Sequence, residues 1–340
     1  MAQETVLVTG GSGFIGSWCV IELLKRGYTV RTTVRSLTSE PGVRSAIGAV
    51  VDPGDRLSFF AANLTSDEGW DAAMAGCDYL VHVASPLGIA EPKDPNELIV
   101  PARDGALRAV GAAIKAGVKR VVMTSSVAAT SRGPDAPDGV ADETVWSDGD
   151  DPRIGAYARS KTIAERAAWD LINSSGGSTT LATVNPALVV GPVLSGDFSG
   201  SIQVVQRLLA GKIPGVPRLG FNIVDVRDVA DLHIRAMTME EAASQRFIAA
   251  GSWAWMMDIA HMLRAGLGAE ASKVPTRKAP DFLLRLVALV DRDIGAVTDS
   301  LGHKRDYTSA KAQATLGWRP RPTEETVLDC ARSLIAAGAV

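Results

Sequence analysis

Two side chains that could exchange a proton with a substrate stand four residues apart, Tyr157 and Lys161. The pattern around them predicts a helix from about Gly155 to Ile172, and positions i and i+4 of a helix share one face. A free phenol, with a pKa of about 10, is a poor acid–base catalyst at neutral pH, but a neighbouring ammonium stabilises the phenolate and lowers that pKa. Lys161 would supply this charge, so Tyr157 is a candidate proton donor.

A hydroxyl group at the end of a predicted strand could hold the same substrate. The apolar run Arg120 to Thr124 predicts a strand, and Ser126 follows it at the carboxyl edge of the sheet. Ser126 and Tyr157 could hold and polarise a carbonyl oxygen while a hydride arrives from a cofactor. Alternatively, Ser126 simply ends a strand; its combination with Tyr157 and Lys161 favours catalysis.

Three glycines follow the first predicted strand at the spacing GxxGxxG. Gly10 would allow a tight turn, Gly13 would let the backbone approach a pyrophosphate, and Gly16 would let the next helix pack closely. The first turn of that helix, with Phe14 and Ile15, would direct its N–H groups at the anion. This pattern indicates a dinucleotide site, although a purely structural turn is the alternative.

The end of the second predicted strand indicates which dinucleotide is bound. Sites that prefer NAD place an Asp or Glu there, whereas this chain has no carboxylate before Glu40. Arg35 stands where its planar guanidinium could pair with a 2′-phosphate, which predicts NADPH/NADP+. Arg31 is the weaker candidate because it lies within the strand, at a position that alternates with buried side chains. Both arginines could instead be solvated surface charges.

Short runs rich in β-branched residues alternate with helical patterns in the first half of the chain. Several runs are apolar on both faces, which is typical of a parallel sheet covered by helices on each side. The fold class is therefore α/β, a Rossmann-type doubly wound parallel sheet with a smaller, mostly helical C-terminal lobe. The predicted strands are Thr5 to Thr9, Tyr28 to Val34, Leu57 to Phe60, Tyr79 to Val83, Arg120 to Thr124 and Thr180 to Val184.

After Pro186 the pattern changes to longer helices, so we expect the chain to leave the sheet there. It would return near Phe221 to Val226 and near Arg246 to Ala250, leaving a cleft at the carboxyl ends of the strands. The NADP-binding domain would comprise residues 1–186 and about 219–250, and the substrate-binding lobe about 187–218 and 251–340.

Composition excludes several classes of partner. The 340 residues carry 35 Lys and Arg against 38 Asp and Glu, and a net charge of −3 provides no field for a nucleic acid. No segment is long and apolar enough for a membrane span, and we expect a cytoplasmic protein without a leader. The three cysteines are expected to be reduced, and the four histidines lack the spacing of metal ligands, so no metal is expected. Whether the protein is a monomer or a homodimer stays open.

Together these motifs resemble the extended short-chain dehydrogenase/reductases, an NAD-dependent epimerase/dehydratase-like superfamily. Within it, the chain is most similar to the branch of dihydroflavonol-4-reductases, cinnamoyl-CoA reductases and microbial aldehyde and ketone reductases. The resemblance covers nearly the whole chain. It is carried by Val8 to Gly16, Thr33 to Arg35, Val81 to Pro86, Ser126, Asp142 to Asp148, Tyr157 to Lys161, Asn185 to Pro192, Asp225 to Ala230 and Leu316 to Arg321.

The resemblance assigns roles to further residues. Ser126, Tyr157 and Lys161 become the catalytic set, and Lys161 also holds the nicotinamide ribose. The remaining cofactor contacts implied are the backbone near Pro186 and Val189 at the carboxamide, Ala84 in the V-H-V-A-S-P motif, and Asn63 with Leu64 at the adenine. Family members usually have Asp in place of Asn63, but an amide oxygen can also accept from the adenine amine.

The function predicted is NADPH-dependent reduction of an aldehyde or ketone to the alcohol. The substrate, a small molecule, would be bulky or aromatic because the expected pocket walls at 86–90, 127–131, 193–201 and 219–222 are largely apolar. A nucleotide-sugar epimerase linked to NAD is an alternative, although Ser126 is followed by Val127-Ala128-Ala129 rather than an acid and no carboxylate ends the second strand. A non-catalytic NADP-sensing protein is another alternative, and it would not need the catalytic set.

Overall fold

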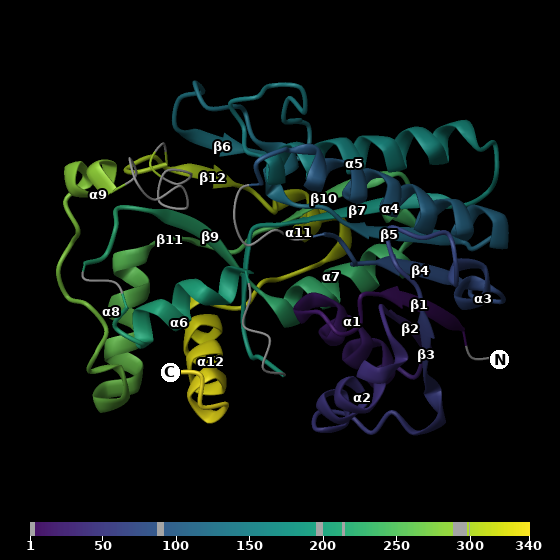
Figure 1. The fold of residues 1–340 in the computed structure, drawn as a ribbon, viewed down its shortest axis with the longest axis horizontal. Coiled ribbons are helices and arrows are strands. Elements are labelled where there is room, and N and C mark those ends of the chain that lie inside the picture. The colour runs from purple at the N-terminus through teal and green to yellow at the C-terminus, as the bar shows by residue number, and fades with distance from the viewer. Residues whose placement is uncertain (1–3, 87–91, 195–199, 213–214, 288–297, 299) are drawn as a thin grey trace.

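A central sheet of parallel strands organises the structure, a computed structural model that describes residues 4–86, 92–194, 200–212, 215–287, 298 and 300–340 (Figure 1). Within this part of the chain the sheet has seven strands in the order β10-β7-β5-β4-β1-β2-β3. This parallel strand order confirms the Rossmann-type fold predicted. The strands β1, β4 and β5 end at one edge of the sheet, its carboxyl edge. The strands are β1 Thr5–Thr9, β2 Thr29–Val34, β3 Leu57–Ala61, β4 Tyr79–His82, β5 Arg120–Thr124, β7 Thr180–Pro186 and β10 Gln245–Ala249.

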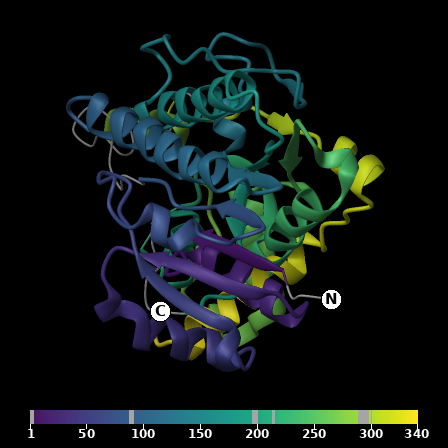
Figure 2. The same cartoon turned by 90° about the vertical axis from the view of Figure 1, so that its right-hand side faces the viewer.

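Helices cover both faces of this sheet because its strands are apolar on both sides. Neighbouring residues of β1 illustrate the alternation: Val6 and Val8 face one buried cluster, and Leu7 faces another. One face carries α1 (Phe14–Lys25), α2 (Glu40–Gly48), α7 (Val226–Thr238) and α11 (Ala310–Leu316). The other carries α3 (Trp70–Met74), α4 (Asn96–Ala116) and α5 (Ala156–Ser174), and the long helices α4 and α5 pack along each other (Figure 2).

A second region has its own sheet and its own core. Its strands β8 (Leu188–Val190), β9 (Gly220–Asp225) and β11 (Trp253–Trp255) pair in the order β11-β9-β8. Its helices enclose a separate apolar cluster that includes Ile202, Leu208, Leu263 and Val327. These helices are α6 (Gln203–Leu209), α8 (Met256–Leu267) and α12 (Thr323–Ala336). A further helix, α9 (Asp281–Val287), lies between α8 and α12 in the chain.

One expected return of the chain to the main sheet is wrong. The segment predicted at Phe221 to Val226 forms β9, which pairs with β8 in the small sheet, with Leu188 opposite Ile223. Only the later return, β10, extends the main sheet by pairing with β7. The reason is that β8 turns away directly after β7 and offers β9 a free edge before the chain comes back.

A short pairing ties the C-terminal part of the chain to the loop that follows β5. Strand β6 (Gly139–Ala141) runs parallel to β12 (Arg305–Tyr307). The buried Asn222 amide of β9 donates to Asp306 at 2.7 Å and accepts from the N–H of Tyr307 at 3.0 Å. Strand β12 therefore contacts both the loop that follows β5 and strand β9 of the second region.

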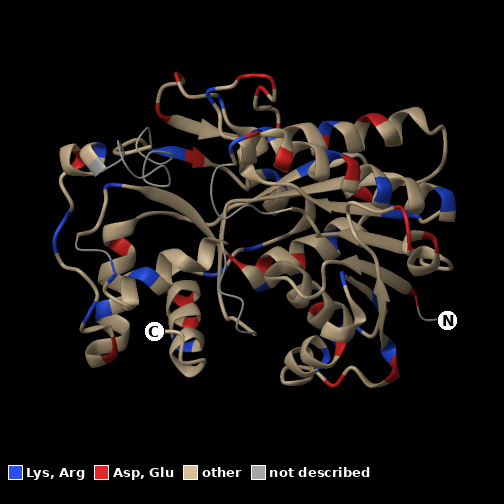
Figure 3. Ribbon diagram, in the orientation of Figure 1, with Lys and Arg blue, Asp and Glu red and all other residues tan. Residues whose placement is uncertain are grey.

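Acidic and basic residues are interspersed along the helices and loops of the fold (Figure 3). Among the described residues, no helix combines the length and apolar character needed to cross a bilayer. Cys19, Cys77 and Cys330 are free and buried, as predicted. Burial raises the pKa of Cys330 to about 12, so this thiol stays protonated.

Candidate active site

The glycine loop has the geometry expected at a pyrophosphate. Gly10 has φ of +71°, and its carbonyl accepts a hydrogen bond from the N–H of Gly13 at 2.9 Å. A Cβ atom at Gly16 would lie 2.2 Å from the Gly10 oxygen, so only glycine fits there. Gly13 is exposed at the N-terminus of α1, ahead of Phe14 and Ile15, leaving space for an anion.

The ends of β1 and β4 form the floor beside this loop. The Thr9 hydroxyl oxygen accepts from the N–H groups of Val83 and Ala84, both at 3.0 Å, which places Ala84 against Gly10. Because both lone pairs of this oxygen are used, the Thr9 hydroxyl donates its own hydrogen bond to Nδ1 of His82, at 2.9 Å. Burial, assisted by the positive charge of Lys161, lowers the pKa of His82 to about 3, so this histidine is neutral.

The two arginines of β2 have different surroundings. Arg31 donates to the carbonyls of Ala73 (3.2 Å) and Ala75 (2.6 Å), and its guanidinium lies 5.3 Å from the Phe60 ring centroid. Arg35 follows the end of β2, is exposed, and has no protein partner among the described residues. Of the two, Arg35 is therefore the guanidinium that the described residues leave available to a ligand.

Asn63 lies at the end of β3, but its amide does not present the group that we expected. Its Oδ1 atom already accepts from both the N–H and the hydroxyl of Thr65, each at 3.1 Å. Both lone pairs are thus used, and the oxygen is not free for the adenine amine. Leu64 is fixed beside it, because its carbonyl accepts from Arg108 at 2.8 Å and its side chain lies against Gly105.

Ser126 follows β5 and caps the short 3₁₀ turn Val127–Thr130. It is 7% exposed, and its Oγ accepts from the N–H of Ala128 at 3.1 Å. This hydrogen bond uses the oxygen as an acceptor and leaves the hydroxyl proton for another group. Ser126 is thereby poised as a donor to a substrate oxygen.

Tyr157 and Lys161 occupy the first turns of α5, which packs on the 3₁₀ turn after Ser126. Tyr157 is half-buried, whereas Lys161 is only 7% exposed. The Lys161 Nζ atom is 5.8 Å from the centre of the Tyr157 ring, so the two side chains share a face as their spacing predicts. Lys161 has no hydrogen-bond partner among the described residues, which leaves its ammonium for a bound ligand.

The segment after β7 lies at the same edge of the sheet. Pro186 is the last residue of β7 and is buried, and Val189 is buried in β8. The Val189 carbonyl accepts from the Ser201 hydroxyl. A carboxamide in contact with Val189 would therefore meet the remaining lone pair of this carbonyl oxygen or the Val189 side chain.

Three buried polar residues beside the site were not singled out from the sequence: Thr9, Glu165 and Asn185. Each has a signal in the sequence, since Thr9 ends the first predicted strand and Asn185 directly follows the sixth. Glu165 stands four residues after Lys161, on the same helical face. Their partners lie far away in the chain, so their roles depended on the fold.

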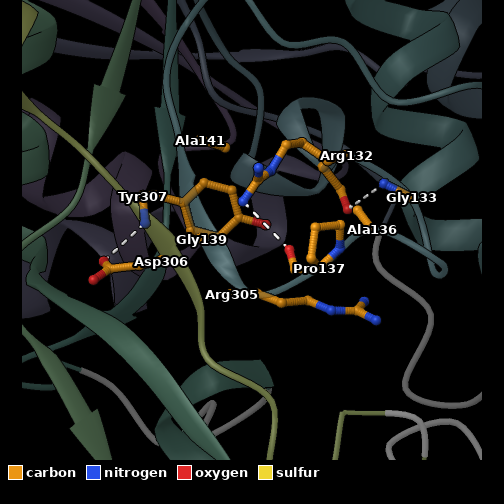
Figure 4. Close-up of a pocket in the computed structure, with 10 residues that line it drawn as sticks. Arg132, Gly133, Ala136, Pro137, Gly139, Ala141, Arg305, Asp306 and Tyr307 are labelled. Carbon is orange, nitrogen blue, oxygen red and sulfur yellow. Dashed lines mark hydrogen bonds between the residues drawn. The ribbon is translucent and has the colours of Figure 1, made fainter.

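A small cavity of about 20 Å³, enough for one water molecule, lies beside the expected pocket wall at 127–131. Arg132 and Tyr307 line it, with the tyrosine ring beside the arginine side chain (Figure 4). Burial raises the pKa of Tyr307, so its phenol is neutral. None of the catalytic set lines this cavity. Of the expected walls, residues 87–90 and 195–199 lie outside the described residues.

Comparisons with known proteins show the family and agree with the fold. Residues 6–251 match the family model "NAD dependent epimerase/dehydratase family". The chain is 37% identical over 251 residues to cinnamoyl-CoA reductase 1 of Arabidopsis thaliana, covering 73% of this chain and 71% of that protein. It is 34% identical over 298 residues to the (2S)-flavan-3-ol-forming anthocyanidin reductase of Vitis vinifera, covering 83% and 85%.

A solved structure matches the fold over nearly its full length. This is the yeast methylglyoxal/isovaleraldehyde reductase Gre2 complexed with NADPH, with a TM-score of 0.80, 25% identity and coverage of 99% of this chain and 100% of that one. The reductase class predicted from the motifs agrees with these relatives. The chain belongs to the NAD dependent epimerase/dehydratase family, as an extended short-chain dehydrogenase/reductase.

Proposed function

We propose that the protein is an NADPH-dependent reductase that converts an aldehyde or ketone to the alcohol. One observation carries the proposal: Lys161 lies 5.8 Å from the centre of the Tyr157 ring on α5, and α5 packs on the 3₁₀ turn that Ser126 caps. A hydroxyl with a free proton and a phenol beside an ammonium are the groups that a carbonyl oxygen needs as it gains charge. Reductases among the relatives support this reaction class.

Residues of this chain suit NADPH at each part of the cofactor. The N–H groups at the start of α1 would hold the pyrophosphate, and Arg35 the 2′-phosphate. Lys161 would hold the nicotinamide ribose, and the chain near Pro186 and Val189 would orient the carboxamide. At the adenine, Asn63 would donate through its amide nitrogen, because its oxygen is engaged with Thr65. The cofactor, when bound, supplies the hydride.

The proton follows a short path in this account. Ser126 donates a hydrogen bond to the carbonyl oxygen and fixes the orientation of the substrate. Tyr157 gives its proton to that oxygen as the carbonyl carbon takes up the hydride, so that a C=O bond becomes CH–OH. Lys161 stabilises the resulting phenolate until Tyr157 is reprotonated from water.

We propose a bulky or aromatic carbonyl compound as the substrate. The described parts of the expected walls are rich in apolar side chains, including Val127, Val193 and Leu219. Cinnamoyl-CoA reductase and anthocyanidin reductase, named for aromatic compounds, support this class. The substrate would lie between the main sheet and the second region, which we take as the division between the NADP-binding domain and the substrate lobe.

The two alternatives are less well supported. An epimerase linked to NAD would favour a carboxylate at the end of β2, where Arg35 lies, and would retain its nucleotide. A non-catalytic NADP sensor would not require a buried Lys161 beside Tyr157.

The test is the oxidation of NADPH, and separately of NADH, with a panel of aryl ketones, aldehydes, dihydroflavonols and sugar nucleotides. We expect selective turnover of NADPH with the aromatic or bulky carbonyl compounds. Turnover that is best with sugar nucleotides, or tight NADP+ binding without turnover of any carbonyl compound, would contradict the proposal.

A further inference from the structure

A fully buried carboxylate lies one helical turn beyond Lys161. Glu165 belongs to α5, the helix that carries Tyr157 and Lys161, and it is 0% exposed. An isolated buried carboxylate is strongly unfavourable, so hydrogen bonds and an opposite charge must compensate it. The groups that compensate Glu165 come from three other segments of the chain and from α5 itself.

One carboxylate oxygen connects α5 to the segment that carries Ser126. Oε2 of Glu165 accepts from the hydroxyl of Ser125 at 2.5 Å and from Nδ2 of Asn185 at 2.9 Å. The same Asn185 nitrogen donates to the backbone carbonyl of Ser126 at 3.2 Å. Ser126 is thus held through its neighbour and through its own carbonyl, and both connections end on a single oxygen atom.

The other oxygen connects α5 to the sheet. Oε1 of Glu165 accepts from the Thr183 hydroxyl of β7 at 2.9 Å and from Nε of Arg246 of β10 at 2.7 Å. Trp169, one turn further along α5, donates to this oxygen at 3.4 Å. Every acceptor position of the carboxylate is therefore occupied by a donor from protein.

Arg246 is itself fixed on its remaining sides. It is 8% exposed, and its Nη1 atom donates to the carbonyls of Glu143 at 2.6 Å and Val145 at 3.0 Å. Its guanidinium stacks 3.6 Å from the Trp146 ring centroid. The planar fork bridges the loop before α5 and the buried carboxylate, a task that lysine cannot reproduce.

We infer that the Glu165–Arg246 pair is a positioning element for the proposed reaction, which sets Ser126 relative to Tyr157 and Lys161. The pair touches neither the substrate nor the reacting atoms. It acts because α5, the Ser126 segment and β7 meet on one carboxylate, so a change there alters the separation of the two groups that hold the carbonyl oxygen. The inference rests on the proposed function.

The variants to compare are Glu165→Gln, Arg246→Met and Arg246→Lys. A glutamine at position 165 would turn an N–H donor toward groups that all donate, and the packing would have to open. Because displacements of about 1 Å can cost about 100-fold in rate, we expect kcat to fall by about 10- to 100-fold in Glu165→Gln and Arg246→Met. Arg246→Lys keeps the charge and should recover part of kcat. The Kd for NADPH should change by less than about threefold, since the side chains of the pair hydrogen-bond none of the residues assigned to the cofactor.

Asp228→Asn is the matched control. Asp228 is 6% exposed and accepts from the backbone N–H and Nε of Arg321, at 2.7 and 3.0 Å, on the opposite face of the sheet. Its loss should lower Tm about as much as the loss of Glu165 while leaving kcat unchanged. The inference is overturned if Glu165→Gln loses no more kcat than Asp228→Asn at an equal loss of Tm.

Hydrogen–deuterium exchange separates failure of this inference from failure of the proposed function. If the wild-type protein reduces no carbonyl compound, the function fails and kinetics cannot report on the pair. Exchange in residues 125–131 should still be faster in Glu165→Gln than in the wild type, and unchanged in Asp228→Asn. Unaltered exchange in Glu165→Gln would overturn the inference, whatever the activity.

Discussion

Arg31 and Arg35 lie in one stretch of chain, yet hydrogen bonding separates their roles. The Arg31 guanidinium is committed to the carbonyls of Ala73 and Ala75, which fasten β2 to the end of α3. Within the described part of the chain, Arg35 makes no such bond and lies exposed just after the end of β2. At the scale of single residues, a ligand can recruit only a group that the fold has not already engaged.

Arg35→Ala should therefore lower kcat/KM with NADPH by about 10- to 100-fold, since a charge-assisted phosphate contact is worth about 1.5–3 kcal/mol. Efficiency with NADH should be nearly unchanged, so the ratio of the two efficiencies is the quantity to measure. Arg31→Ala is the control: it should lower Tm and leave the ratio alone. An unchanged ratio in Arg35→Ala would mean that another group reads the 2′-phosphate.

Residue identities were sufficient to propose a catalytic set but not to predict the hydrogen bonds around it. Tyr157 and Lys161 are close in sequence, and helical spacing alone predicts a shared face. Glu165 and Arg246 are separated in the chain by β7, β8, α6, β9 and α7, so only the sheet order brings them together. The engagement of Asn63 by Thr65 is local, but an alternative use of its oxygen was equally compatible with the sequence.

At the scale of elements, the strand–loop–helix unit at β1 and α1 depends on close backbone approach. The carbonyl of Gly10 occupies the space where a Cβ atom of residue 16 would lie, at 2.2 Å. Contacts that short are not tolerated, so the loop must move if residue 16 gains a side chain. Such a movement would turn the first N–H groups of α1 away from the pyrophosphate.

Gly16→Ala should weaken NADPH binding by at least about 100-fold, because several charge-assisted hydrogen bonds are lost together. Isothermal titration measures the effect directly. Gly111→Ala in α4 is the comparison: a Cβ atom there meets nothing within 4 Å, so helix propensity should stabilise the protein by up to about 1 kcal/mol. Equal NADPH affinity in the wild type and Gly16→Ala would refute this account of the loop.

Elements with strong local patterns were predictable, and those chosen by partners were not. The six predicted strands all occur, because β-branched runs apolar on both faces suit few environments other than a covered parallel sheet. Strand β9 was correctly placed along the chain and assigned to the wrong sheet, since its pairing partner depends on the direction of β8. Helix α4 contains Pro101, a residue that weakens a helical pattern in the sequence.

The whole molecule should lose stability in mild acid, because two histidines are buried in neutral form. Burial lowers the pKa of His233 to about 4, and that of His82 to about 3, from an ordinary value of 6.5. His233 donates to the Val229 carbonyl and accepts from Thr124 at 2.7 Å. Below pH 6.5 the unfolded chain binds protons that the folded one does not, so the free energy of unfolding falls as pH falls toward 4.

Urea unfolding across that pH window measures the effect. Each histidine should contribute a slope of up to about 1.4 kcal/mol per pH unit, and His233→Gln should remove the contribution of one residue. Above about pH 8, where the imidazole is deprotonated in both the folded and the unfolded chain, neither histidine should contribute a slope. If His233→Gln showed the same pH dependence as the wild type, the acid sensitivity would have to come from other groups.

The most direct test of the central claim is a comparison of the wild type with Tyr157→Phe, measuring kcat with the best carbonyl substrate and Kd for NADPH on the same preparations. The phenyl ring keeps the packing of α5 and removes only the proton donor. We expect kcat to fall by about 100- to 10,000-fold, the usual contribution of a general acid, with Kd for NADPH within about twofold. A Tyr157→Phe protein with nearly full kcat would show that another group supplies the proton and would contradict the account.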